Sequence, residues 1–371
     1  MPVKVVYILS DLDFALAFGW VAKHLNKEAI SLEVILINHD RKETELERIF
    51  LAEHIPVHKV QAANGRRAVL TVGKVRMLLR KIRPQVVHCH MRRANIIGLT
   101  AAWLARIPKR VYTRHYAMQN HVYHPQAVKA DLFVNSLATH IVAPSQVVKD
   151  TLLKKEKVYP GKVLIIEHGF DIAYFAKPNE LDVNNLQNEL NINDNQPVVG
   201  VIARYLELKG IQYIIPAFAR LLQDFPDAVL LLANARGPYQ STIRHLLKDL
   251  PAHSYREIDF EKRLAALYGC MHSFVHVPVS ADIEAFGQIY VEALAAGIPS
   301  VFTLSGIAHQ FVVHKHNAWV VDYRNSDAIY EGLKALCTNQ SLRADLIANG
   351  QKDVESFALD TFIRKTEALY V

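Results

Sequence analysis

Two glutamates, Glu284 and Glu292, lie eight residues apart in a segment whose pattern indicates a loop followed by a helix. Phe286 and Gly287 lie between them at the expected helix start, where unpaired backbone N–H groups and the helix dipole favour an anion such as a diphosphate. A carboxylate near this start can accept hydrogen bonds from the hydroxyl groups of a sugar or ribose. It cannot do so from ionised phosphate oxygens, which have no proton to donate. The alternative is an acidic residue near a helix start beside an ordinary surface glutamate.

Two cations, Arg204 and Lys209, follow the apolar segment 197–203 in what the pattern indicates is a loop after a strand. Arginine binds phosphate through two parallel N–H bonds, and lysine adds a point charge. The pair therefore indicates a phosphate contact in the same half of the chain, although exposed surface cations would give the same pattern.

These residues must be positioned by strands and helices that alternate along the chain. Short apolar, β-branched runs separated by amphipathic stretches predict βαβ units wound into parallel sheets. The expected strands are 3–9, 32–38, 57–61, 86–90, 110–115, 140–143, 163–168, 197–203, 228–233, 274–278, 300–303 and 318–322. A helix expected over 68–83 ends where Pro84 cannot continue its hydrogen bonds. Ligands of such sheets bind beyond the carboxyl ends of the strands, so the following loops are where chemistry is expected.

The length of 371 residues exceeds what one hydrophobic core usually supports and predicts two domains. A polar, asparagine-rich stretch over 182–196 interrupts the alternation, and we place the linker just before it. The expected domains are 1–175 and 176–356. A final amphipathic segment, 357–371, is expected to form a C-terminal helix, for which packing on the first domain is one option.

Charge is divided unevenly between the two halves of the chain. Residues 1–170 carry 26 Lys/Arg against 13 Asp/Glu, and the remainder carries 17 against 23, which gives the net charge of +7. Residues 61–130 contain 14 basic residues and no acidic residue, which favours an acidic partner. One explanation is a solvated helix face that includes Arg66 and Arg67. The other is docking on anionic lipid through a basic face near Arg92 and Trp103.

The remaining composition bounds the compartment and the partners. The sequence contains no run of about 20 apolar residues, the length that a membrane-spanning helix needs. Its N-terminus lacks the succession of basic, apolar and small residues that is typical of a signal peptide. Three scattered cysteines fit reduced thiols. We therefore expect a cytoplasmic protein, with peripheral attachment at the inner face of the membrane as an option. Nucleic acid is not an expected partner, since no recognised module accompanies the basic charge.

Taken together, the motifs resemble the retaining family 4 glycosyltransferases, which have two Rossmann-like parallel-sheet domains facing a cleft, the GT-B architecture. Glu284 and Glu292 match the family's E-x7-E motif, and Arg204 and Lys209 match its phosphate-binding pair. The likeness covers nearly the whole chain. In the first half, 86–90 and 111–115 resemble the family's histidine-bearing strand ends, and 167–171 resembles its domain-boundary turn, with His168 where asparagine is frequent.

The resemblance implies an α/β fold and a role for each matched residue. Donor binding would involve Arg204, Lys209, Phe286, Gly287, Gln288 and Glu292. The catalytic groups would be Glu284, on the donor sugar hydroxyls near the reacting carbon, and His115, which would face that sugar across the cleft. The acceptor side or the cleft would include Ser10, Asp11, His88 and His90. Ser10 and Asp11 belong to a segment, 10–14, that replaces the glycine-rich loop common in the family.

The implied reaction moves a sugar from a nucleotide-diphosphate donor to a hydroxyl group, with retention of anomeric configuration. A surface polysaccharide, lipopolysaccharide or lipid-linked glycan would be the acceptor. Fixed cations and a helix start would stabilise the charge of the leaving diphosphate, so no metal and no other cofactor is expected.

Other functions stay open at this point. A nucleotide-sugar epimerase can share the architecture and the donor, and a non-catalytic nucleotide-sugar-binding or membrane-binding protein would not need Glu284. A dehydrogenase is disfavoured because no G-x-G-x-x-G follows an expected strand. The alternating histidines of 88–90 and 314–316 raise the possibility of zinc, but their local spacing assembles no set of three or four converging ligands.

Overall fold

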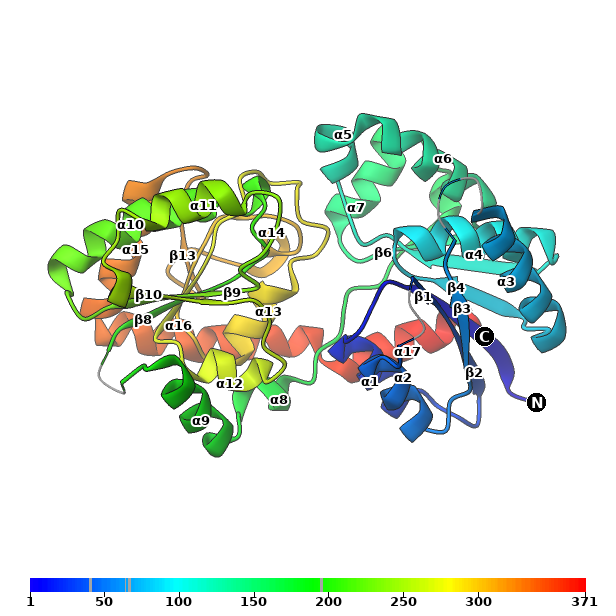
Figure 1. Cartoon of the computed structure of the whole chain (residues 1–371), viewed down its shortest axis with the longest axis horizontal. Helices are drawn as coiled ribbons and strands as arrows, with labels where there is room; N and C mark the ends of the chain where they lie inside the picture. Colours follow the sequence, from blue (N-terminus) through cyan, green and yellow to red (C-terminus); the bar gives the residue numbers. More distant parts are fainter. Residues whose placement is uncertain (40–41, 64, 66–67, 194–195) are drawn as a thin grey trace. The chain divides into compact units, whose positions relative to one another are not determined.

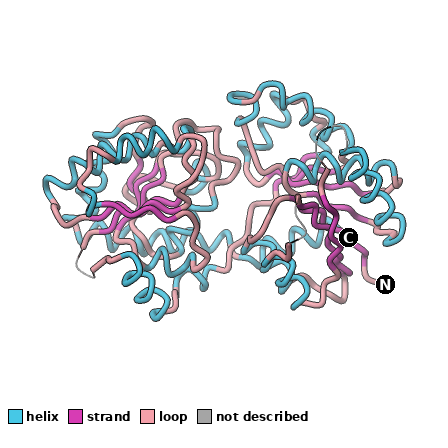
Figure 2. Tube along the Cα trace, viewed as in Figure 1, coloured by secondary structure: helices cyan, strands magenta, loops and turns pink. Residues whose placement is uncertain are grey.

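The protein is described by a computed structural model that covers residues 1–39, 42–63, 65, 68–193 and 196–371 (Figure 1). It divides into two compact units, one formed by Met1–Gly169 with Leu359–Val371 and the other by Phe170–Ala358. Each unit is an open parallel sheet enclosed by helices (Figure 2). The predicted α/β class with two Rossmann-like sheets is confirmed.

The first unit has a 7-stranded sheet in the order β3-β2-β1-β4-β5-β6-β7. Its strands are Val3–Ser10 (β1), Ile30–Asn38 (β2), Val57–Gln61 (β3), Val86–Cys89 (β4), Lys109–Thr113 (β5), His140–Ala143 (β6) and Val163–Ile165 (β7). The central strands are apolar and buried because helices cover both faces of a parallel sheet. The strand order reverses between β1 and β4, and ligands of such sheets bind at the carboxyl edge beside that point.

Eight α-helices belong to the described part of the first unit. They are Leu16–His24 (α1), Glu45–Ala52 (α2), Ala68–Ile82 (α3), Arg92–Leu104 (α4), Gln119–Tyr123 (α5), Val128–Leu137 (α6), Gln146–Asp150 (α7) and Leu359–Tyr370 (α17). The last of these is the chain's C-terminal helix, which places Ile363, Leu369 and Tyr370 in one core with Val5 and Tyr7 of β1. Figure 1 shows α17 beside α1, in agreement with their contact.

The second unit has a 6-stranded sheet in the order β10-β9-β8-β11-β12-β13. Its strands are Val198–Ile202 (β8), Val229–Ala233 (β9), Tyr255–Ile258 (β10), Ser273–His276 (β11), Ser300–Phe302 (β12) and Trp319–Val320 (β13). Its helices are Ile172–Ala176 (α8), Glu180–Leu190 (α9), Ile211–Asp224 (α10), Gln240–Leu247 (α11), Leu264–Gly269 (α12), Gln288–Ala295 (α13), Ala308–Phe311 (α14), Ser326–Thr338 (α15) and Gln340–Asp353 (α16). Here the order reverses between β8 and β11, so the loops that follow these two strands are adjacent.

The structure differs from the sequence-based expectations in a few elements. Strand β10 was not predicted, because Tyr255, Arg256 and Glu257 interrupt its apolar character at the sheet edge. The polar stretch over 182–196 contains most of helix α9, which Asn179 caps through its side chain. Several strands are shorter than expected, so His90, His115 and His168 lie just beyond strand ends. Arg66 and Arg67 lie outside the described residues.

Candidate functional site

A close approach of two loops in the second unit brings Lys209 to Glu284. Lys209 ends a short 3-10 turn after β8, and Gly210 follows it with a positive φ of 75°. A Cβ on Gly210 would lie 1.9 Å from the carbonyl oxygen of Val277, so only glycine lets this loop lie against the end of β11. Lys209 Nζ then donates to Glu284 Oε1 at 2.6 Å.

The Glu284 carboxylate is nearly buried, with 12% of its side chain exposed. His276, the last residue of β11, places Nε2 3.2 Å from the same Oε1 atom. The backbone N–H of Glu284 donates to the Ser305 hydroxyl oxygen, which anchors the loop. Burial alone would raise the pKa of Glu284, but the Lys209 ammonium and His276 outweigh it and hold this pKa well below its usual value. Glu284 is therefore a fixed negative charge.

Glu292 lies in the second turn of helix α13 and has very different surroundings. The residue is 9% exposed, and its Oε2 accepts a hydrogen bond of 3.0 Å from the Tyr268 hydroxyl. Burial raises the pKa of Glu292 to about 7, and the Tyr268 hydrogen bond only partly opposes this effect. The carboxyl group can therefore gain or lose its proton near neutral pH.

The start of helix α13 lies between these glutamates. Gly287 is its N-cap, with a φ of 83°, and no side chain among the described residues caps the helix. Gln288 is exposed at the first helical position. Phe286, by contrast, is buried in an aromatic cluster, where it stacks on Phe170 and meets Phe357 edge-on. Phe286 thus has a packing role, and any ligand contact from this position would come from its backbone.

Arg204 occupies the first position after the buried segment Val198 to Ala203. It is exposed, while its neighbour Tyr205 is buried and donates a hydrogen bond to Glu257. The predicted donor residues Lys209 and Glu284 are thus in direct contact, Glu292 follows on α13, and Arg204 is exposed in the loop that leads to Lys209.

Four histidines gather at the carboxyl edge of the first sheet, and we call His88, His90, His115 and His168 the histidine cluster. The rings of His88 and His90 lie 4.1 Å apart, and those of His115 and His168 stack at 5.8 Å. His90 Nδ1 lies 3.3 Å from His115 Nε2, a hydrogen-bonding distance.

Burial keeps the histidine cluster neutral. It lowers the pKa of His88 to about 3, of His115 to about 4 and of His168 to about 3, and it also lowers that of His90. The cluster therefore offers uncharged hydrogen-bonding groups. His88 Nδ1 lies 2.6 Å from the hydroxyl oxygen of Tyr370 in the C-terminal helix, and its Nε2 lies 2.8 Å from the hydroxyl oxygen of Thr113.

The other predicted residues of the first unit, Ser10 and Asp11, follow β1. The Ser10 hydroxyl is buried and accepts a hydrogen bond from the N–H of Ala94 at the start of α4. Asp11 has a positive φ of 55° and pairs with Arg93 at 3.3 Å. Both residues therefore have structural partners within their own unit.

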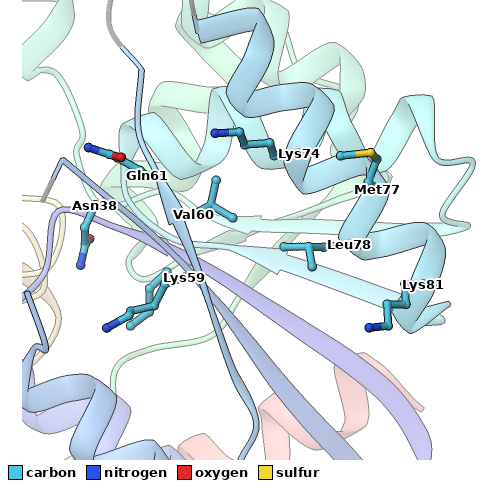
Figure 3. Close-up of a pocket in the computed structure, with 9 residues that line it drawn as sticks. Asn38, Lys59, Val60, Gln61, Lys74, Met77, Leu78 and Lys81 are labelled. Atoms are coloured by element: carbon cyan, nitrogen blue, oxygen red, sulfur yellow. The ribbon is translucent and has the colours of Figure 1, made fainter. Parts of the chain in front are cut away.

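A separate pocket of about 460 Å³ runs along edge strand β3 and helix α3 (Figure 3). Its lining combines lysine with apolar and amide side chains, namely Leu36, Asn38, Lys59, Val60, Gln61, Lys74, Met77, Leu78 and Lys81. Lys59 is engaged by Glu47 at 3.1 Å. The lining includes none of the predicted site residues, so this pocket is distinct from both groups of residues described above.

Sequence reasoning missed two residues that contact the predicted ones, His276 beside Glu284 and Tyr268 beside Glu292. It noted His168 in the boundary turn but did not predict its contact with His115. A histidine that ends an otherwise apolar strand was the available signal for His276. No sequence pattern links Tyr268 to Glu292. Within the described residues, no group of three or more His, Cys, Asp or Glu side chains has a geometry that could hold a metal ion.

Two family models match most of the chain between them. One is described as "Glycosyltransferase Family 4" and matches residues 21–174, and the other, "Glycosyl transferases group 1", matches residues 182–353. Among curated proteins, the alpha-monoglucosyldiacylglycerol synthase of Acholeplasma laidlawii is 24% identical over 98% of this chain and 96% of its own length. The capsular polysaccharide biosynthesis glycosyltransferase CapM of Staphylococcus aureus is 24% identical over 92% of this chain and 90% of its own.

Solved structures share the fold. Anabaena HepE in complex with UDP-glucose superposes with a TM-score of 0.82 at 20% identity, covering 99% of both chains. WaaG, a glycosyltransferase involved in lipopolysaccharide biosynthesis, superposes with a TM-score of 0.75 at 13% identity over 100% of both chains. None of the described helices has the length and apolar composition needed to span a bilayer.

Proposed function

We propose a specific reaction for this chain, which belongs to glycosyltransferase family 4 and is a glycosyltransferase. The chain transfers a sugar from a nucleotide-diphosphate donor to a hydroxyl group of a lipid-linked glycan or surface polysaccharide, without a metal ion and with retention of configuration. The observation that carries this proposal is the contact between Lys209 and Glu284 beside the start of helix α13. The cation that we propose to bind phosphate and the carboxylate that we propose to bind the sugar are in direct contact.

The proposed role of Arg204 and Lys209 follows from the charge of the leaving group. When the bond between the anomeric carbon and the diphosphate oxygen breaks, negative charge grows on the diphosphate and positive charge on the sugar ring. Arg204, Lys209 and the N–H groups at the start of α13 would stabilise the diphosphate, so fixed protein charges would serve in place of a divalent metal. The new bond joins the anomeric carbon to the acceptor oxygen, and the acceptor's proton passes to the departing phosphate.

The glutamates and His115 account for the orientation of the donor. The ionised Glu284 would accept hydrogen bonds from the donor sugar and stabilise the adjacent positive charge. Glu292 would accept those of the ribose. His115 would supply a neutral hydrogen-bonding group for the sugar, since its low pKa keeps it uncharged. Acceptor attack from the face that the diphosphate leaves would retain the configuration.

A lipid-linked acceptor is supported by the surface of the first unit. Apolar side chains of helices α4 to α6 are exposed, with Trp103 at 53%, Val122 at 56% and Phe133 at 47% of their full areas. Arg92 and Lys129 of the same helices are exposed as well. Aromatic and basic side chains together favour the interface of an anionic bilayer. We therefore propose a cytoplasmic enzyme that docks peripherally on an anionic membrane.

Transfer assays test the reaction. The purified chain would be incubated with radiolabelled UDP-, GDP- and ADP-sugars, each with and without detergent-dispersed membrane lipids and with EDTA. We expect one donor to label a lipid or glycan product, an unchanged rate in EDTA, and retained anomeric configuration by NMR of the product. A folded chain that neither hydrolyses nor transfers any of these donors would contradict the proposal. Conversion of the donor sugar without an acceptor would indicate epimerisation instead.

Vesicle flotation tests the docking. We expect the chain to float with vesicles that contain phosphatidylglycerol and to stay behind with pure phosphatidylcholine. The double substitution Trp103→Ser and Phe133→Ser should abolish flotation while leaving the chain folded, because 53% of Trp103 and 47% of Phe133 are exposed. Equal binding of the wild type to both kinds of vesicle would rule out an electrostatic contribution.

A further inference from the structure

The Glu284 carboxylate has two neighbours on one oxygen atom. Lys209 Nζ lies 2.6 Å and His276 Nε2 lies 3.2 Å from Glu284 Oε1. Under the proposed function, on which this inference rests, Lys209 also binds the diphosphate of the donor. The ammonium group of Lys209 therefore has two competing anionic partners, the Glu284 carboxylate and the diphosphate of the donor.

We propose that His276 is a positioning residue that holds Glu284 in place while Lys209 turns toward the donor's diphosphate. A nearly buried carboxylate that loses its cation keeps its charge only if another donor satisfies it, because an unpaired buried charge is strongly unfavourable. His276 is already beside the oxygen that Lys209 would release. A small movement of either side chain would convert this contact into a full hydrogen bond.

The chemistry of His276 suits this task. Its Nε2 is buried and lies 3.2 Å from Glu284 Oε1, within ion-pair distance but short of a well-aligned hydrogen bond. Buried polar atoms without a well-formed hydrogen bond are rare in folded proteins, and each one calls for an explanation. Burial lowers the pKa of His276 more than Glu284 raises it, so the ring is neutral. A neutral ring with its proton on Nε2 donates one hydrogen bond and adds no charge that would compete for the phosphate.

His276 is also held rigidly, as a positioning residue must be. It is 2% exposed, and its ring meets Tyr290 of helix α13 edge-on at 5.0 Å. Its carbonyl accepts the N–H of Thr303 on the neighbouring chain segment. The next residue, Val277, provides the carbonyl against which Gly210 lies, so the backbone that carries His276 also fixes the loop that carries Lys209.

This arrangement also selects which carboxylate oxygen meets the donor. Within the described residues, both side-chain contacts of Glu284 use Oε1. With Oε1 held by His276, Oε2 faces the donor sugar as an acceptor for its hydroxyl groups. His276 thus acts on the sugar through Glu284, without touching it.

Two substitutions at position 276 separate positioning from packing. His276→Gln keeps an N–H donor at the place of Nε2, whereas His276→Leu fills similar volume without a donor. We expect the leucine variant to lower kcat about tenfold, the loss that corresponds to one hydrogen bond to a charged group. The glutamine variant should recover most of this loss. Dissociation constants for UDP, GDP and ADP should rise in the leucine variant, because without His276 the release of Lys209 leaves the Glu284 carboxylate unsatisfied, and they should return toward the wild-type values in the glutamine variant.

The kinetic outcomes and NMR complete the test. If the glutamine variant loses as much kcat and nucleotide affinity as the leucine variant, or if the leucine variant keeps the wild-type kcat, the positioning role is wrong. The histidine tautomer gives a readout that needs no turnover: ¹⁵N NMR of the wild type should show the proton of His276 on Nε2, and its resonance should shift downfield when the nucleoside diphosphate is added. A proton on Nδ1, or no response in a nucleotide-bound sample, would overturn the inference. Absence of transfer by the wild type would instead count against the proposed function.

Discussion

The surroundings of Glu284 and Glu292 show how one type of side chain acquires two different properties within eight residues. Glu284 contacts the ammonium of Lys209 and stays ionised, while Glu292 accepts a phenolic hydrogen bond from Tyr268 and meets no cation among the described residues, so burial raises its pKa to about 7. Both carboxylates are nearly buried, and burial alone would raise both pKa values. The difference therefore comes from the partner that each one meets, and it suits Glu284 to stabilising positive charge and Glu292 to reversible hydrogen bonding.

The largest expected effect comes from removing the charge of Glu284. Glu284→Gln keeps the shape but removes the negative charge that we propose to lie beside the reacting carbon, and we expect kcat to fall by about 10²–10³-fold, as for other electrostatic groups in active sites. Nucleotide affinity should change little. Glu292→Gln is the matched control: it should weaken nucleotide binding more than it lowers kcat. The same pattern in both variants would contradict the division of roles.

A smaller loss is expected when the cation beside Glu284 is removed. Lys209→Ala deletes the proposed phosphate contact and leaves His276 as the side-chain partner of Glu284 among the described residues, so donor affinity and kcat should each fall about tenfold or more. Steady-state kinetics with the active nucleotide sugar would measure both. Lys248→Ala, at an exposed lysine of the same unit, serves as the control and should match wild type. A selective effect on kcat alone would mean that Lys209 does not bind the donor.

The pH dependence of nucleotide binding should follow Glu292. Under the proposed function, ribose hydroxyls donate to the ionised form of Glu292. Nucleotide affinity should therefore be constant above the pKa of about 7 and should decrease below it, with a slope that approaches about tenfold per pH unit. Calorimetric titration with the intact nucleotide sugar, whose phosphates do not titrate in this range, at pH 5.5 to 8.5 would measure this. Glu292→Gln should remove this dependence, and Glu284→Gln should leave it. An unchanged slope in Glu292→Gln would assign the titration to another group.

Stability should show the opposite trend with pH at the same residue. Because folding raises the pKa of Glu292 from 4.5 to about 7, the folded chain holds this proton more tightly than the unfolded chain. Its contribution to stability is fully present below about pH 4.5 and is lost as the pH rises through 7, by up to about 3 kcal/mol. Urea unfolding at pH 8 should therefore find Glu292→Gln more stable than wild type. A less stable variant at this pH would contradict the raised pKa.

The smallest expected effect is that of the phenolic partner. Tyr268→Phe removes the hydrogen bond to Glu292 and should raise the pKa of this carboxyl group further, since that bond lowers it. At pH 7 we expect nucleotide affinity to fall only a few-fold, in line with one neutral donor, and the midpoint of the pH dependence to move upward. Tyr290→Phe, whose hydroxyl bonds the Thr303 carbonyl instead, is the control. Equal midpoints in wild type and Tyr268→Phe would show that this bond does not tune Glu292.

Much of the fold could be predicted from local pattern. The alternation of apolar strands and amphipathic helices indicated two parallel sheets, because strands buried on both faces read as continuous apolar runs. Strand β10 escaped this reasoning because a polar edge strand has no such run. Helix α9 escaped it because its sequence is rich in asparagine, and its side-chain cap becomes evident only in the structure.

The sequence by itself determined which residue types stand at which loops: Arg204 and Lys209 after one strand, and Glu284 and Glu292 around a helix start. Only the tertiary structure decided that Lys209 and His276 meet at one oxygen of Glu284, that Tyr268 reaches Glu292, and that His168 joins the histidines of two other strands. The physical reason is that a βαβ crossover brings together residues far apart in the chain, and that charge in a protein interior depends on burial and neighbours. Neither the contacts between distant residues nor the charge state of a buried group is a property of the local sequence.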